Sequence, residues 1–134
     1  MAAKSVRLLR IAYWTGAILD GVTIPPMLSP QLGAKMLGVR NFHASLEYRY
    51  AMFVGAALMF GWTVLLLWAD RKPIERRGVL PLTVFAVMTG LVGASVYAGA
   101  SGLFGLRAMI PMLAIQLTVS TVFLFAYLRV RPAQ

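Results

Sequence analysis

The sequence predicts an all-α integral membrane protein, an antiparallel up-down four-helix bundle. The first indication is composition: 60% of the 134 residues are hydrophobic and 13% are charged, against about 45–50% and roughly 25% in soluble domains. The second is four apolar stretches, each with the roughly 20 residues that a helix needs to cross the hydrocarbon core. We expect these spans to form a single domain, 1–134. They cover residues 6–24, 46–68, 79–100 and 108–128.

The apolar stretches read as helices rather than strands or a cleaved leader. A membrane barrel needs a polar residue at every second position, and none of the four stretches alternates in that way. The first stretch contains Asp20 and is followed by Pro25 and Pro26 instead of a small-residue cleavage site. We therefore expect a retained helix, ended by the proline pair because proline has no N–H to donate.

Basic residues predict that both ends of the chain lie in the cytoplasm (N-in, C-in). Of the 13 Lys and Arg residues, nine fall near the two ends and in the turn 70–78, and four fall in or beside the other two connections. Cytoplasmic loops carry the excess of Lys and Arg, so the larger group belongs inside. The nine are Lys4, Arg7, Arg10, Arg71, Lys72, Arg76, Arg77, Arg129 and Arg131; the four are Lys35, Arg40, Arg49 and Arg107.

The connection 25–45 is long and half apolar, and it predicts a short amphipathic helix at about 30–38. Ser29 and Pro30 form a start signal, and Gly38 is a stop signal. This helix is expected at the outer membrane surface. A lid folded over the mouth of the bundle fits the same residues, and the sequence leaves both open.

Several classes of function find no support in the sequence. A net charge of +9 suggests nucleic acid in a soluble protein, but here the basic residues flank apolar spans and no basic stripe is interleaved with aromatics. The absence of cysteine excludes thiol catalysis and cysteine-ligated metals. We expect neither nucleic-acid binding, nor a metal site, nor an enzyme.

Small and polar residues predict where helices pack. Ala86, Gly90 and Ala94 form a ridge of the small-xxx-small kind, which lets helices approach closely. We expect it to serve packing within the chain, with a homodimer seam as the alternative. Gln116 and Ser120 lie one turn apart in the last helix and are expected to bond a neighbouring helix.

Asp20 is the residue with the strongest claim to a functional role. A bare carboxylate inside a membrane helix costs at least about 2.5–3.5 kcal/mol, so a partner, a proton or water is expected. Arg49 is the expected partner, because its long arm can reach a carboxylate. The other ligand or ion-pair candidates at the outer side are Glu47, Tyr97, Arg107 and His43.

Two interpretations of this polar group stay open. It is either an ion pair that fixes helix register, or a small polar cavity that binds a ligand or exchanges a proton. Glu47 and Arg107 fit a second ion pair or plain exposure, and His43 is expected in an exposed loop.

The function that the sequence favours is that of a non-enzymatic accessory or assembly subunit of a larger membrane complex. The alternative is a small homo-oligomeric transporter or ligand-binding bundle with its site at Asp20. Expected partners are the lipid bilayer and other membrane subunits or further copies of the chain. No cofactor is indicated, although a lipid, pigment or quinone fits an apolar groove without a motif. The expected location is the bacterial cytoplasmic (inner) membrane.

Overall fold

The computed structural model describes residues 2–39, 42–103 and 105–130, and within these ranges the chain is helical with no strand. The all-α prediction is therefore confirmed. Three helices are long and apolar enough to cross a membrane, and they comprise Leu46–Asp70, Val79–Ala100 and Met109–Arg129. The elements are α1 (Ala2–Leu28), α2 (Pro30–Met36), α3 (Leu46–Asp70), α4 (Val79–Leu82), the π-helix η1 (Thr83–Met88), α5 (Thr89–Ala100) and α6 (Leu106–Arg129).

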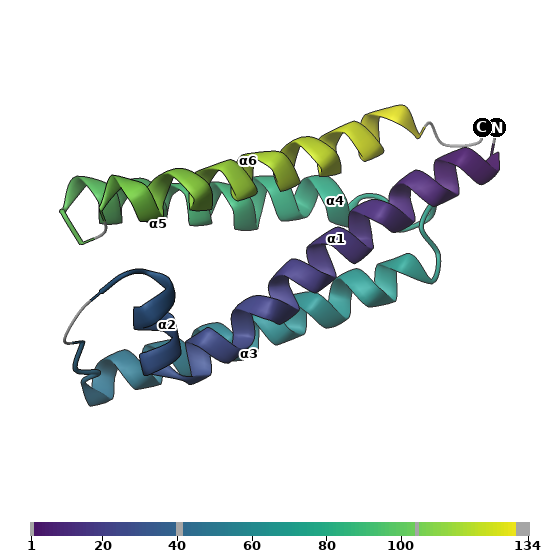
Figure 1. Ribbon diagram of the computed structural model, residues 1–134. Helices are drawn as coiled ribbons and strands as arrows, with labels where there is room; N and C mark the ends of the chain where they lie inside the picture. Colours follow the sequence, from purple (N-terminus) through teal and green to yellow (C-terminus); the bar gives the residue numbers. More distant parts are fainter. Residues whose placement is uncertain (1, 40–41, 104, 131–134) are drawn as a thin grey trace.

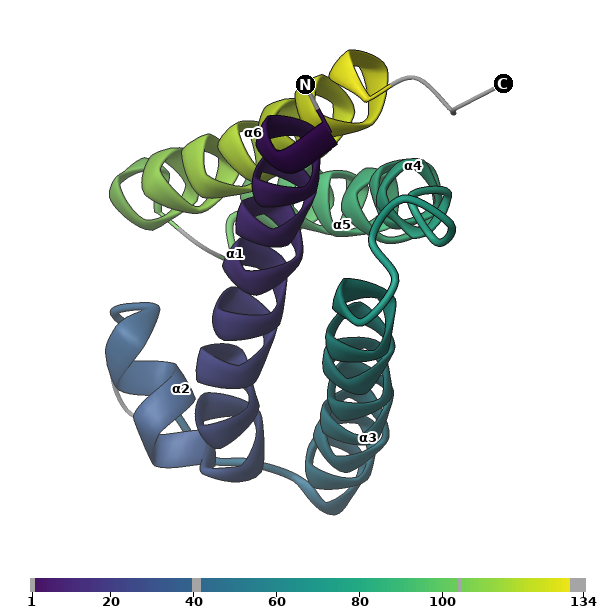
Figure 2. The same ribbon diagram turned by 90° about the vertical axis from the view of Figure 1, so that its right-hand side faces the viewer.

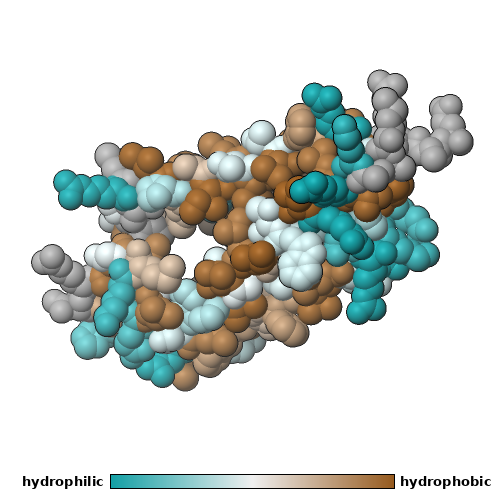
Figure 3. All heavy atoms as spheres, turned by 45° about the vertical axis from the view of Figure 1, so that its right-hand side comes forward, coloured by the Kyte–Doolittle hydropathy of each residue, from teal (hydrophilic) through white to brown (hydrophobic). Residues whose placement is uncertain are grey.

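The helices form two antiparallel pairs that meet at one end and diverge at the other (Figures 1 and 2). One pair is α1 with α3; the other is α6 with the continuous run α4, η1 and α5. The start of α1, the end of α6 and the turn 71–78 lie where the pairs meet, which we call the terminal end. The opposite end, which carries α2, is the open end. Figure 3 shows the molecule hollowed between the pairs, with an apolar middle and hydrophilic side chains toward both ends.

The buried core lies toward the terminal end and is built on one face of α1. Leu9, Tyr13 and Phe123 are fully buried, and so are Leu66 and Leu80. On α1 the buried positions recur at steps of three and four residues, which places them on one side of the helix. The two pairs are thus held together at the terminal end.

A glycine sets the closest approach within this core. A Cβ added to Gly16 would lie 2.5 Å from Cζ of Phe123 and 2.9 Å from Cδ1 of Leu66. Both of those side chains are fully buried, so neither is free to move aside. Only glycine lets α1 pack this closely against α3 and α6.

Hydrogen bonds from the basic turn close the terminal end. The Tyr13 hydroxyl donates to the carbonyl oxygen of Arg76 at 3.0 Å, which joins the middle of α1 to the turn. The Arg76 guanidinium donates to the carbonyl of Trp68 and lies 3.4 Å from the centre of that indole ring. The Arg77 guanidinium donates to the carbonyl of Val130, just beyond α6. The turn therefore contacts α1, α3 and the end of α6.

Helix α1 does not end at the proline pair; it continues through Pro25 and Pro26 to Leu28. Each proline removes one helical N–H···O=C bond, and because both lie in the last turn the loss is confined to the end of the helix. The carbonyl of Pro25 still accepts from the backbone N–H of Ser29 at 3.0 Å. The expected end near residue 24 is thus four residues too early.

The third apolar stretch contains a π-helical segment, Thr83–Met88, that the sequence does not predict. Thr83 is buried, and its hydroxyl donates to the carbonyl of Val79 at 2.7 Å while accepting from Nε1 of Trp62 at 3.2 Å. The Thr89 hydroxyl donates to the carbonyl of Val84, five residues earlier, at 3.1 Å. These side chains bond the irregular turn and tie it to α3.

Helix α2 is short and exposed, and it ends in a Schellman motif. Gly38 has φ +69°, its N–H donates to the carbonyl of Lys35, and the N–H of Val39 donates to the carbonyl of Ala34. No residue of α2 is buried. It packs against the end of α1. A Cβ added to Gly33 would lie only 2.9 Å from the carbonyl oxygen of Pro26.

Candidate functional site

Asp20 is the outermost buried residue on the inward face of α1. Only 8% of it is exposed, and it lies one helical turn beyond Gly16, toward the open end. Its backbone carbonyl accepts from the Thr23 hydroxyl at 2.7 Å. Within the described ranges its carboxylate makes no hydrogen bond and no ion pair. An acid so placed needs a proton, water or a ligand to offset its burial.

The other candidates at the open end do not gather around Asp20. No hydrogen bond or ion pair joins any two of them in the part of the chain that the structure describes, and the expected Asp20–Arg49 pair is not formed there. Each of the five is exposed to solvent or lipid. They are His43, Glu47, Arg49, Tyr97 and Arg107.

Helix α3 begins with a local cap that explains part of this arrangement. The Ser45 hydroxyl oxygen accepts from the backbone N–H of Tyr48 at 3.2 Å, so the helix starts at Leu46. Glu47 then lies in the first turn, where a negative charge is favoured by the helix dipole. Arg49 lies in the next turn and is exposed. A local helix start thus accounts for Glu47 without any ligand.

Gln116 does bond a neighbouring helix. Its side-chain Nε2 donates to Oγ of Ser95 at 3.1 Å, and that hydroxyl donates to the carbonyl of Leu91 at 2.8 Å. Ser95 is buried and Gln116 is half-buried, and this amide–hydroxyl pair joins α5 to α6. Ser120 instead donates to the carbonyl of Gln116 in its own helix at 2.8 Å.

The small-residue ridge faces away from the chain. Ala86, Gly90 and Ala94 are all exposed. A Cβ built on Gly90 or on the adjacent Gly93 would have no atom of the described chain within 4 Å. The ridge therefore does not serve the packing within the chain that we expect from the sequence. Its surface is free to contact lipid or another protein chain.

A second acidic group, at the terminal end, was not predicted as a site. Asp70 is 16% exposed at its side chain; Nε1 of Trp14 donates to its Oδ2 at 3.3 Å, and Nε of Arg10 lies 3.5 Å from its Oδ1. Oδ1 has no hydrogen bond, so the contact with Arg10 is an ion pair only. Arg10 and Trp14 lie one turn apart on α1, which is the sequence signal for a shared partner.

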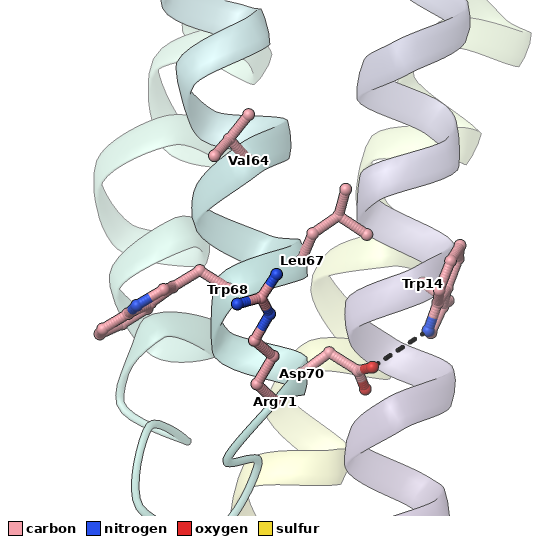
Figure 4. Close-up of a pocket in the computed structure, with 6 residues that line it drawn as sticks. All are labelled: Trp14, Val64, Leu67, Trp68, Asp70 and Arg71. Atoms are coloured by element: carbon pink, nitrogen blue, oxygen red, sulfur yellow. Dashed lines mark hydrogen bonds between the residues drawn. The ribbon is translucent and has the colours of Figure 1, made fainter.

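Trp14 and Asp70 border a cavity of about 460 Å³ between α1 and α3, shown in Figure 4. Its wall combines two indoles and two aliphatic side chains with one carboxylate and one guanidinium. A single carboxylate that is already paired offers no acid–base couple. The described residues also hold no group of three side chains suited to a metal. The lining residues are Trp14, Val64, Leu67, Trp68, Asp70 and Arg71.

Comparison of the chain with protein-family models, with curated proteins and with solved structures found no match.

Proposed function

We propose that this small membrane protein crosses the bilayer four times, with α1 as the fourth span and both ends in the cytoplasm. Helix α1 has 27 residues, enough to span, and it packs along α3, which is one of the three apolar spans. Its basic residues Lys4, Arg7 and Arg10 lie at the terminal end, beside the basic turn 71–78. Helix α2 then lies at the outer surface.

We further propose that the chain is a non-enzymatic accessory or assembly subunit of a larger complex, in a bacterial cytoplasmic membrane. The observation that carries this is the outward-facing ridge of Ala86, Gly90 and Ala94. Small residues at this spacing let helix backbones approach closely and gain van der Waals contact, which is the main attraction between helices in lipid. A ridge unused by its own chain is suited to a helix of another chain.

Extraction in mild detergent followed by size separation tests this function. The expected result is that the chain migrates with a defined larger complex, and that Gly90→Leu releases it while its helical content is unchanged. Val96→Leu is the matched control, because Val96 is exposed on another side of the same helix. Migration of the wild-type chain by itself, or equal release by both variants, would contradict the proposal.

Asp20 favours a second candidate, a homo-oligomeric transporter or ligand-binding bundle. Its buried carboxylate has no partner in the described ranges, and it lies where the two helix pairs diverge. Ionisable residues of this kind mark ion and proton pathways in membrane proteins. In reconstituted vesicles Asp20→Asn should abolish proton-coupled flux while the protein stays folded. In a subunit the same change leaves flux unaffected and acts, if at all, on assembly.

A further inference from the structure

A groove of about 370 Å³ lies between the first turns of α1 and the last turns of α6, at the terminal end. Its lining is divided into two levels. Lys4 precedes Leu8 by one turn on α1, and Arg129 follows Phe125 by one turn on α6. The two helices run in opposite directions, so both cations lie toward the chain ends and both apolar side chains lie deeper. The remaining lining residue is Ser5.

Among the described residues, the two cations of the groove have no acidic partner. Of its four acidic residues, only Asp70 and Glu75 lie at the terminal end. Asp70 pairs with Arg10, and Glu75 pairs with Lys72 at 3.0 Å. Among the described residues neither Lys4 nor Arg129 forms an ion pair. Two like charges lining one groove repel each other, and an anion bound between them removes that repulsion.

The apolar side chains of the groove, Leu8 and Phe125, limit the kinds of molecule that can bind there. The Arg129 guanidinium lies 5.1 Å from the ring centre of Phe125, so the cation and the apolar wall are in direct contact. An inorganic anion would satisfy the cations but would leave the wall of Leu8 and Phe125 exposed. A molecule with an anionic head and an apolar tail satisfies both levels.

We infer that this groove binds one anionic phospholipid of the cytoplasmic leaflet, with its phosphate between Lys4 and Arg129 and an acyl chain against Leu8 and Phe125. Basic pockets between membrane helices on the cytoplasmic side bind anionic headgroups in this way. The inference rests on the proposed span of α1 and is independent of the accessory role. It gives the two ends of the chain a shared ligand, held by one cation from each.

The test is native mass spectrometry of the full chain in a neutral detergent, with phosphatidylglycerol or phosphatidylethanolamine added. The wild-type chain is expected to retain phosphatidylglycerol in preference. Lys4→Gln combined with Arg129→Gln should weaken that binding about 25-fold, since each basic residue near an anionic surface contributes about fivefold. The control is Arg7→Gln combined with Arg71→Gln, which removes two exposed cations of the same end that do not line the groove.

The groove proposal is overturned if the control pair weakens binding as much as the groove pair, because the effect would then be one of general surface charge. It is also overturned if both lipids bind the wild-type chain equally. Excess inorganic phosphate should leave the lipid bound; displacement by phosphate would make a free anion the ligand. The span of α1 is tested separately by labelling, so a failure here leaves the membrane topology standing.

Discussion

Nε1 of Trp14 donates a hydrogen bond to Oδ2 of Asp70 across 3.3 Å, and this bond joins the middle of α1 to the last residue of α3 (Figure 4). The same carboxylate faces Arg10 one turn earlier on α1. One acid at the end of α3 thus fixes the register of α1 through two side chains. This contact lies at the terminal end, where the helix pairs meet.

Replacing Asp70 should destabilise the fold. Asp70→Ala leaves the Trp14 N–H without its acceptor and Arg10 without its counter-ion, and the loss of a partner for a partly buried group costs about 1–2 kcal/mol. Glu75→Ala is the control, because its ion pair with Lys72 is exposed on both sides and should change stability by no more than about 0.5 kcal/mol. Unfolding in mixed detergent micelles measures both. Equal losses of stability in the two variants would show that the contacts of Asp70 contribute no more than an exposed ion pair.

The close approach at Gly16 predicts a steric effect. Gly16→Ala places a Cβ against Phe123 and Leu66, and overpacking of this kind costs about 1–3 kcal/mol. Gly21→Ala is the matched control in the same helix, because nothing lies within 4 Å of its added Cβ. There alanine should stabilise by up to about 1 kcal/mol, since glycine loses more backbone entropy. The same micelle unfolding assay should give shifts of opposite sign for the two variants.

Hydropathy predicts the fold class because the lipid environment allows the backbone few conformations. A chain crossing the hydrocarbon core must satisfy its own N–H and C=O groups, so long apolar runs without alternation become helices. Leu46–Asp70 and Val79–Ala100 follow directly from this rule. A local signal predicts well where it is self-contained: Gly38, predicted as a stop signal, ends α2 through a Schellman motif.

The sequence alone does not show which residues of different helices contact each other. The π-segment depends on a bond from Trp62 to Thr83, between residues on different helices, and no local pattern indicates it. Periodicity likewise shows which residues of α1 share a face with Asp20, but not how α3 is rotated about its axis. That rotation leaves Arg49 exposed, and so the expected pair does not form within the described residues. The sequence likewise does not show how α5 is rotated about its axis, and so the outward direction of Gly90 was not predicted.

The bond between Gln116 and Ser95 predicts a modest contribution to packing. Gln116→Leu removes the side-chain amide that joins α6 to α5, and interhelical hydrogen bonds in membranes contribute about 0.6 kcal/mol on average and up to about 1.7. Thr118→Val is the control, because Thr118 is exposed and donates only to the carbonyl of Ala114 in its own helix. A thermal unfolding series in detergent measures both. A neutral Gln116→Leu would show that apolar contacts alone hold α5 to α6.

The absence of cysteine makes the topology directly testable, because each introduced thiol is the only one present. Four spans place Glu75→Cys on the same side as both chain ends, and His43→Cys and Ser101→Cys on the opposite side. A membrane-impermeant maleimide added to intact cells should therefore label the last two variants and spare the first. If α1 lay on the cytoplasmic surface instead of crossing, α3 would begin on the same side as the N-terminus. An N-terminal epitope tag and the thiol of His43→Cys would then be accessible from the same side of the membrane. That result would show that α1 does not cross the bilayer.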